Sequence, residues 1–163
     1  MDNVLIDAAE ILLAACRKRN WTLATAESCT GGMVAAALTA IAGSSDVVDR
    51  GFVTYTNEAK HEMIGVPIIL FASVGAVSEE VARAMAEGAR KTACVDLACG
   101  ITGVAGPGGG SAEKPVGLVH IAVASADATL HERCLFDGDR HAVRLASALK
   151  ALEMMQVLAK GKP

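Results

Sequence analysis

Residues 26–32, Ala-Glu-Ser-Cys-Thr-Gly-Gly, bring a hydroxyl, a thiol and several backbone N–H groups to one point of the chain. An apolar segment precedes them and a run of small residues follows, which predicts a strand, a tight turn and then a helix. The first N–H groups of a helix lack partners within it and carry partial positive charge. We therefore expect the N–H groups around Cys29, Thr30 and Gly31 to bind an anion or the oxyanion of a reacting carbonyl, at roughly 3 kcal/mol per donor.

Ser28 is a candidate nucleophile in this turn, and it needs a base. Lys60 ends the segment 55–60, Tyr-Thr-Asn-Glu-Ala-Lys, and its amine serves as a base if burial keeps it neutral. Tyr55 is a candidate for relaying a proton or orienting that amine. From the residue types alone, the commoner arrangement is a serine that only caps a helix and a lysine that is solvated.

Cys29 is a competing nucleophile, because a helix N-terminus lowers the pKa of a thiol. The alternative is that Cys29 is a small buried residue. Among the histidines, we expect His120 within a strand and His131 on the surface. No histidine has an acid at an informative spacing, so the sequence does not favour a Ser-His-Asp triad.

The glycine-rich segment 103–110 is a candidate phosphate loop, since glycines let the backbone approach an anion closely. It is not a P-loop, because Gly109 stands where that motif needs lysine. A flexible surface loop is the alternative. Arg140, beside the capping residue Asp139, is a candidate charged partner for the phosphate. For both Arg140 and Arg144, the commoner arrangement is a side chain that is solvated at the start of a helix.

The remaining pattern predicts the elements that must position these residues. Helices are expected to open at Asp2, Ser78 and Asp139, and over residues 31–41 and 57–64. Strands are expected over residues 21–26, 47–56, 95–101, 117–124 and 129–136. This alternation predicts one α/β domain, a three-layer α/β/α sandwich around a mixed, mainly parallel sheet. Sites in such sheets lie beyond the carboxyl ends of strands, so residues 28, 55–60 and 102–110 should converge.

Composition narrows the class of protein further. The chain has 163 residues, of which 52% are hydrophobic and 20% charged, enough for one domain (residues 1–163) with its own core. A net charge of −3 argues against a nucleic-acid partner. The five cysteines are an odd number without paired metal spacing, and Cys94 and Cys99 are expected in the core. With no leader peptide or membrane-length apolar run, we expect a cytoplasmic protein without metal or membrane contacts. The alanine-rich composition suits a homodimer without requiring one.

Several of these motifs together resemble the CinA C-terminal domain family. The resemblance rests on residues 26–32, residues 55–60, and the segment 100–109, Gly-Ile-Thr-Gly-Val-Ala-Gly-Pro-Gly-Gly. Lys-Pro-Val-Gly at 114–117 and Phe-Asp-Gly-Asp-Arg at 136–140 add to it, in the same order and across nearly the whole chain. Longer family members carry an additional N-terminal domain, and we expect this chain to represent the stand-alone form.

The resemblance implies a nicotinamide-nucleotide amidase that converts nicotinamide mononucleotide and water into nicotinate mononucleotide and ammonia. It implies no cofactor and a serine–lysine mechanism, in which Ser28 is the nucleophile, Lys60 the general base and Tyr55 the partner of Lys60. The other residues that it places around the substrate are Cys29, Thr30, Gly31, Thr102, Gly103, Gly106 and, against the phosphate, Arg140. Two alternatives stay open: a non-catalytic pyridine-nucleotide-binding or regulatory module, and an amidase of another substrate that depends on Cys29.

Overall fold

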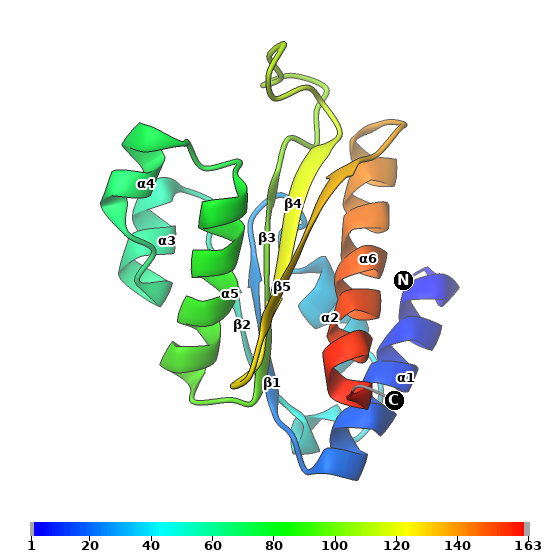
Figure 1. Cartoon of the computed structure of the whole chain (residues 1–163). Coiled ribbons are helices and arrows are strands. Elements are labelled where there is room, and N and C mark those ends of the chain that lie inside the picture. Colours follow the sequence, from blue (N-terminus) through cyan, green and yellow to red (C-terminus); the bar gives the residue numbers. More distant parts are fainter. Residues whose placement is uncertain (1, 162–163) are drawn as a thin grey trace.

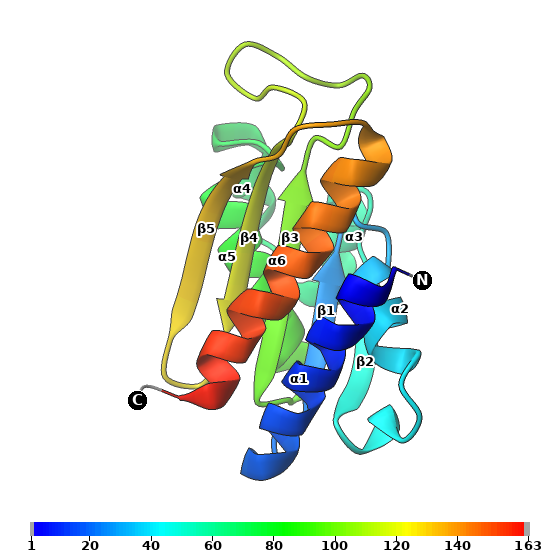
Figure 2. The ribbon, with the colours of Figure 1, turned by 90° about the vertical axis from the view of Figure 1, so that its right-hand side faces the viewer.

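The computed structural model describes residues 2–161 and has a five-stranded sheet between two layers of helices (Figures 1 and 2). One layer contains α3 (Asn57–Ile64), α4 (Ile68–Ser73) and α5 (Glu79–Ala93). The other contains α1 (Asn3–Arg19), α2 (Met33–Thr39) and α6 (Arg140–Lys160). The predicted three-layer α/β/α sandwich is therefore confirmed.

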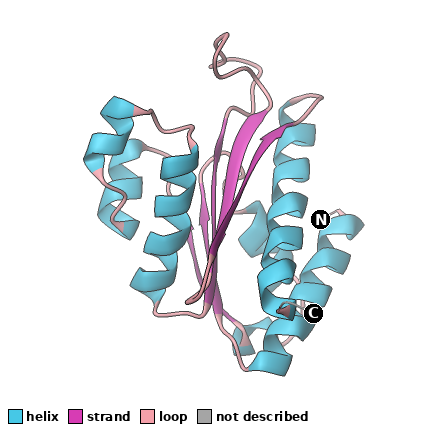
Figure 3. Cartoon of the chain, viewed as in Figure 1, coloured by secondary structure: helices cyan, strands magenta, loops and turns pink. Residues whose placement is uncertain are grey.

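The sheet is mixed, and its strands lie in the order β2-β1-β3-β4-β5 (Figure 2). Figure 3 shows the strands as one layer with helices on both sides. The strands are β1 (Leu23–Glu27), β2 (Val48–Val53), β3 (Leu97–Gly103), β4 (Leu118–Ala124) and β5 (Thr129–Leu135). β1 pairs in parallel with β2 and β3, whereas β4 is antiparallel to β3 and β5. The three parallel strands thus end at one edge of the sheet, and the segments that follow them meet there.

The helices begin where local chemistry provides a cap. The side chains of Asp2, Ser78 and Asp139 each accept a hydrogen bond from the first turn of α1, α5 and α6, as predicted. α2 begins two residues later than expected, because Gly31 and Gly32 have φ values of 61° and 96°, outside the helical region. The sequence prediction omitted α4, a six-residue helix in which no residue is fully buried and only Leu70 and Phe71 pack partly against the core.

Small side chains let the helices lie close to the sheet. Every residue of β1 is buried, and a Cβ atom added at Gly100 in β3 would collide with the backbone of α5 at Ala82. α5 therefore lies directly on β3, and the segment before α5 reaches the end of that strand. Cys99 is in the core as expected, but Cys94 is exposed, because it forms the left-handed C-cap of α5.

None of the helices within residues 2–161 combines the length and the apolar character that a membrane span requires.

Candidate active site

The turn that carries Ser28 is fixed to the end of the neighbouring strand. The Ser28 N–H donates to the carbonyl of Ile101 in β3 at 3.0 Å, and the Gly31 N–H donates to the Ser28 carbonyl at 3.0 Å. Because Ile101 lies one residue before Thr102, this turn and the segment after β3 share one edge of the sheet. The hydroxyl of Ser28 is thereby held at the point where β1 and β3 end.

Lys60 lies against this hydroxyl. Thr56 caps α3 by accepting a hydrogen bond from the Ala59 N–H, and Lys60 follows in the first turn with only 2% of its surface exposed. Its Nζ lies 3.1 Å from Ser28 Oγ and donates to the carbonyls of Thr54 and Tyr55 at 2.9 and 3.4 Å. Burial lowers the pKa of Lys60, and no carboxylate of residues 2–161 forms an ion pair with it.

Burial favours the neutral form of this amine, which can accept the serine proton. A neutral amine has two N–H groups and one lone pair. The carbonyls of Thr54 and Tyr55 occupy the two N–H groups, which leaves the lone pair for the hydroxyl of Ser28. The candidate nucleophile and the candidate base therefore lie within hydrogen-bonding reach of each other, as serine activation requires.

Ser28 and Lys60 lie at the wall of a pocket with a volume of about 310 Å³. The three predicted segments converge here, because eight of the ten predicted site residues line the pocket: Ser28, Cys29, Tyr55, Lys60, Thr102, Gly103, Gly106 and Arg140. Asn57, Ala76, Val77 and further residues of the β3–β4 loop complete the lining. The lining contains two basic residues, Lys60 and Arg140, and no carboxylate, so the pocket suits an anionic ligand.

Thr30 and Gly31 do not line this pocket, contrary to the prediction. Thr30 is fully buried, and the Gly31 N–H is already bonded to the Ser28 carbonyl. Of the N–H groups expected to be available, those of Cys29 and Thr30 have no acceptor among the described residues, whereas that of Gly31 has one. The buried carboxylate of Glu27 accepts hydrogen bonds from Gly32, Val34 and Ala35 at 3.1, 3.1 and 2.9 Å, so an internal anion occupies this helix N-terminus.

The Cys29 N–H remains as a donor at the pocket. It has no acceptor among the described residues, and Cys29 itself lines the pocket. The thiol of Cys29 behaves differently from the prediction, because burial raises its pKa to about 11. The thiol is therefore protonated near neutral pH, which argues against Cys29 as the nucleophile.

Tyr55 contacts Lys60 through its main chain rather than through its phenol. The Tyr55 hydroxyl accepts a hydrogen bond from Arg140 at 2.8 Å, and its side chain is 57% exposed. Arg140 also donates to the Gly106 carbonyl at 2.8 Å and forms no ion pair within residues 2–161. The phenol of Tyr55 thus orients an arginine that forms no ion pair, whereas the predicted contact of Tyr55 with Lys60 is made by its main-chain carbonyl.

The segment after β3 forms the opposite wall of the pocket. The hydroxyl of Thr102 donates to the Ala76 carbonyl at 2.8 Å, which connects β3 to the segment before α5. A Cβ atom at Gly103 would lie 2.7 Å from the side chain of Val119, so no larger residue fits there. The β3–β4 loop extends beyond this end of the sheet, close to the start of α6 (Figure 1).

The sequence prediction missed the roles of Glu27 and Arg144. Arg144 Nε donates to the Cys29 carbonyl at 3.0 Å, and its NH2 group donates to the Thr30 carbonyl at 2.8 Å. One signal was present: Arg140 and Arg144 lie near the positive end of a helix, where cations are unfavourable. Two arginines at this position indicate that each is stabilised by contacts outside its own helix.

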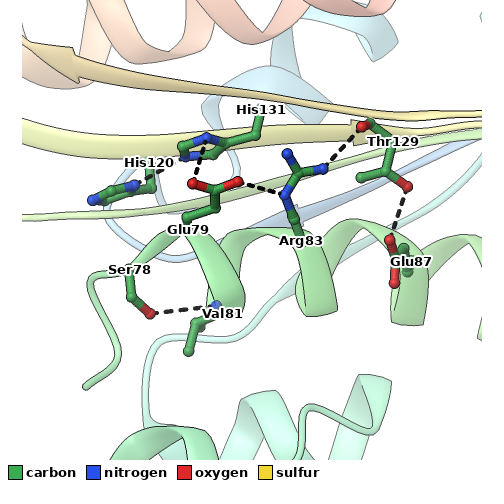
Figure 4. Close-up of polar contacts among 8 residues, drawn as sticks. All are labelled: Ser78, Glu79, Val81, Arg83, Glu87, His120, Thr129 and His131. Carbon is green, nitrogen blue, oxygen red and sulfur yellow. Dashed lines mark hydrogen bonds and ion pairs between the residues drawn. The ribbon is translucent and has the colours of Figure 1, made fainter. Parts of the chain in front are cut away.

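His120 and His131 lie outside the pocket, in a cluster between β4, β5 and α5 (Figure 4). His120 Nδ1 lies 3.0 Å from His131 Nε2, and His131 Nδ1 lies 3.4 Å from Glu79, which also bonds Arg83. His120 is in a strand as predicted, but His131 is largely covered rather than on the surface, and it has an acid partner. Burial lowers the pKa of His120 to about 4. Neither histidine reaches Ser28, which agrees with the absence of a triad.

Residues 6–158 match the CinA C-terminal domain. A relative from Enterobacter agglomerans named nicotinamide-nucleotide amidohydrolase PncC is 50% identical over 141 residues, which cover 86% of this chain and 86% of the relative. A CinA-like protein from Anaeromyxobacter dehalogenans is 50% identical over 148 residues, which cover 91% of this chain and 36% of that protein. The chain thus spans about a third of the length of the CinA-like proteins that it matches.

Solved structures have the same fold. The competence/damage inducible protein CihA from Agrobacterium tumefaciens is 47% identical, with a TM-score of 0.92 and 95% of each chain covered. The competence damage-inducible protein A from Klebsiella pneumoniae is 35% identical, with a TM-score of 0.91, covering 97% of this chain and 99% of that one.

Proposed function

This chain belongs to the CinA C-terminal domain family, and on that premise we propose that it is a nicotinamide-nucleotide amidase with a serine–lysine mechanism. The substrate is nicotinamide mononucleotide, and the products are nicotinate mononucleotide and ammonia. The observation that carries the proposal is the 3.1 Å contact between Lys60 Nζ and Ser28 Oγ at the wall of the pocket. The name of the relative that is 50% identical over 86% of both chains supports this substrate.

In the first half of the reaction, Ser28 Oγ attacks the carboxamide carbon, which the pyridinium ring makes electron-poor. Lys60 takes the hydroxyl proton as the new C–O bond forms. The developing oxyanion is stabilised by the Cys29 N–H, the amide next to the nucleophile. Lys60 then returns the proton to the leaving nitrogen, so that ammonia departs and a nicotinoyl ester remains on Ser28.

In the second half, water attacks the ester carbon and gives a proton to Lys60. The C–O bond to Ser28 breaks, Ser28 regains its proton from Lys60, and nicotinate mononucleotide is released. These steps need neither a metal ion nor an organic cofactor.

Arg140 is the candidate contact for the phosphate. Its guanidinium has five N–H donors, and two neutral acceptors, Tyr55 Oη and the Gly106 carbonyl, leave its charge uncompensated. A guanidinium held in this way recognises a phosphate without first breaking an ion pair. Lys60 is buried behind Ser28, so Arg140 is the accessible charge in the pocket.

The direct test measures ammonia and nicotinate mononucleotide together after incubation with nicotinamide mononucleotide. The wild type should form both in equal amounts, and Ser28→Ala should form neither while still binding the substrate in calorimetry. Ser73→Ala, which removes an exposed hydroxyl on α4, is the matched control and should retain full turnover. A wild type that binds the nucleotide without releasing ammonia would instead be a binding or regulatory module. Turnover by Ser28→Ala would refute the assigned nucleophile.

A further inference from the structure

Arg144 lies behind the Ser28 turn, on the side away from the pocket. It lines a separate surface hollow of about 430 Å³ together with Gly31, Met33 and His141. Its two contacts to the turn are to the carbonyls of Cys29 and Thr30, which are 115 and 114 residues away in the sequence. No carboxylate of residues 2–161 forms an ion pair with it. Its charge is therefore directed at the main chain of the turn.

A continuous path of hydrogen bonds leads from this guanidinium to the pocket. Arg144 donates to the Thr30 carbonyl at 2.8 Å, and the same peptide group carries the Gly31 N–H. The Gly31 N–H donates to the Ser28 carbonyl at 3.0 Å, and that peptide group carries the Cys29 N–H. Because a trans peptide is planar, its N–H points opposite to its C=O. Holding each carbonyl therefore fixes the direction of the next N–H.

The hydrogen bonds of this series also polarise one another. A charged donor strengthens the bond to the Thr30 carbonyl, and hydrogen bonds in series reinforce one another. The Gly31 N–H becomes a better donor to Ser28, and the Cys29 N–H becomes a better donor toward the pocket. The second contact, from Arg144 Nε to the Cys29 carbonyl at 3.0 Å, fixes the peptide group that follows.

Glu27 holds the other side of the same segment. Its carboxylate binds N–H groups of residues 32, 34 and 35, whereas Arg144 binds carbonyls of residues 29 and 30. A Cβ atom at Gly31 would approach Arg144 NH2 to 3.3 Å, so the turn and the guanidinium are in close contact. The turn is thus held between an anion and a cation, and rotation of the Ser28–Cys29 peptide would break the hydrogen bond from the Gly31 N–H to the Ser28 carbonyl.

We propose that Arg144 is a positioning residue that orients and polarises the Cys29 N–H as the oxyanion donor, through the peptide groups of Thr30–Gly31 and Ser28–Cys29. The proposal rests on the amidase function and adds a residue that touches no reacting atom. A group of this kind acts on the transition state, where negative charge develops, and leaves ground-state binding nearly unchanged.

The test compares Arg144→Met and Arg144→Lys with the wild type. Loss of a complete oxyanion donor costs about 10²- to 10³-fold in kcat. Arg144→Met loosens the donor without deleting it, so we expect kcat to fall about 10- to 100-fold, with KM within about twofold. Arg144→Lys keeps the positive charge but can make only one of the two contacts, so its kcat should lie between those of Arg144→Met and the wild type.

Chemical rescue separates this role from a simple loss of packing. The hollow beside Arg144 is open to solvent, so added guanidinium at non-denaturing concentration should partly restore kcat in Arg144→Met and have no such effect on the wild type. Arg83→Met is the matched control, because Arg83 also donates to a main-chain carbonyl, that of Thr129 at 2.9 Å, away from the pocket (Figure 4). It should keep its kcat.

Amide hydrogen exchange across residues 28–33 provides a readout that does not depend on turnover. In Arg144→Met the Gly31 amide should exchange faster, and guanidinium should reverse this change. Unchanged exchange, a wild-type kcat in Arg144→Met, or a loss of kcat that guanidinium fails to restore would each overturn the proposal. If the wild type releases no ammonia, the amidase function fails, and the exchange data alone decide whether Arg144 holds the Cys29–Gly31 peptides.

Discussion

The buried amine of Lys60 should make the stability of this protein depend on pH in a defined direction. Burial lowers the pKa of Lys60 in the folded state below its ordinary value of 10.5. Between the folded pKa and 10.5, the unfolded chain binds a proton at Lys60 that the folded protein does not bind. The free energy of unfolding therefore rises with pH in this window, by at most about 1.4 kcal/mol per pH unit. Below the folded pKa, the full penalty of the buried charge is present.

Lys60→Met should remove this dependence. The substitution also leaves the carbonyls of Thr54 and Tyr55 without their donor, at a cost of about 1–3 kcal/mol for each buried group. That cost does not vary with pH. The difference in unfolding free energy, wild type minus Lys60→Met, should thus increase with pH across the window and level off near 10.5. Each unit by which the pKa is lowered contributes about 1.4 kcal/mol to the total rise.

Urea unfolding of both proteins from neutral pH to about pH 10 measures this difference. The buried thiols of Cys16 and Cys29, whose pKa values are raised to about 11, lower stability at high pH. The contribution of Cys16 is the same in both proteins and cancels, whereas the thiol of Cys29 interacts with the Lys60 amine, so both proteins carry Cys29→Ala in this comparison. Lys91→Met, which removes an exposed amine from α5, is the matched control for the loss of one lysine. In the wild type, kcat/KM should rise with pH over the same window, because the neutral amine is the active form.

Two parallel stability curves would refute the reasoning, since they would mean that folding does not perturb Lys60. A rise in kcat/KM at a pH unrelated to the stability window would assign the activity to another base. Neither of these two tests depends on how much activity the Lys60→Met substitution removes.

Three further perturbations test other parts of the site. Cys29→Ala should retain turnover within about threefold, because the thiol is protonated near neutral pH and the backbone N–H is kept; a loss similar to that of Ser28→Ala would contradict this. Arg140→Gln should raise KM for nicotinamide mononucleotide at least tenfold and leave KM for the uncharged riboside nearly unchanged, and equal effects on both would exclude a phosphate contact. Glu27→Gln should lower the free energy of unfolding by about 2 kcal/mol in urea, compared with less than about 0.5 kcal/mol for the exposed Glu62→Gln.

Local sequence signals predicted most of the fold. The caps at Asp2, Ser78 and Asp139 and the helix at residues 57–64 depend on neighbours a few residues apart, and the structure has them where expected. The prediction failed at α4, where no residue is fully buried, and at the start of α2, which two glycines with positive φ delay. In neither place does the spacing of apolar side chains indicate where the helix begins.

Residue types and their spacing were enough to identify the available groups: a serine and several amides in a turn after β1, a lysine one turn into α3, and a glycine-rich segment after β3. The role of each group depends on packing between segments that are distant in the chain. Burial among distant segments lowers the pKa of Lys60 and raises that of Cys29, whereas the helix N-terminus alone predicted a lower pKa for the thiol. The carboxylate of Glu27 accepts hydrogen bonds from amides at the start of α2, and Arg144 donates to the carbonyl of Cys29, 115 residues away in the sequence. Hydrogen-bond partners and desolvation depend on which surfaces pack together, and spacing along the chain carries no information about them at that range.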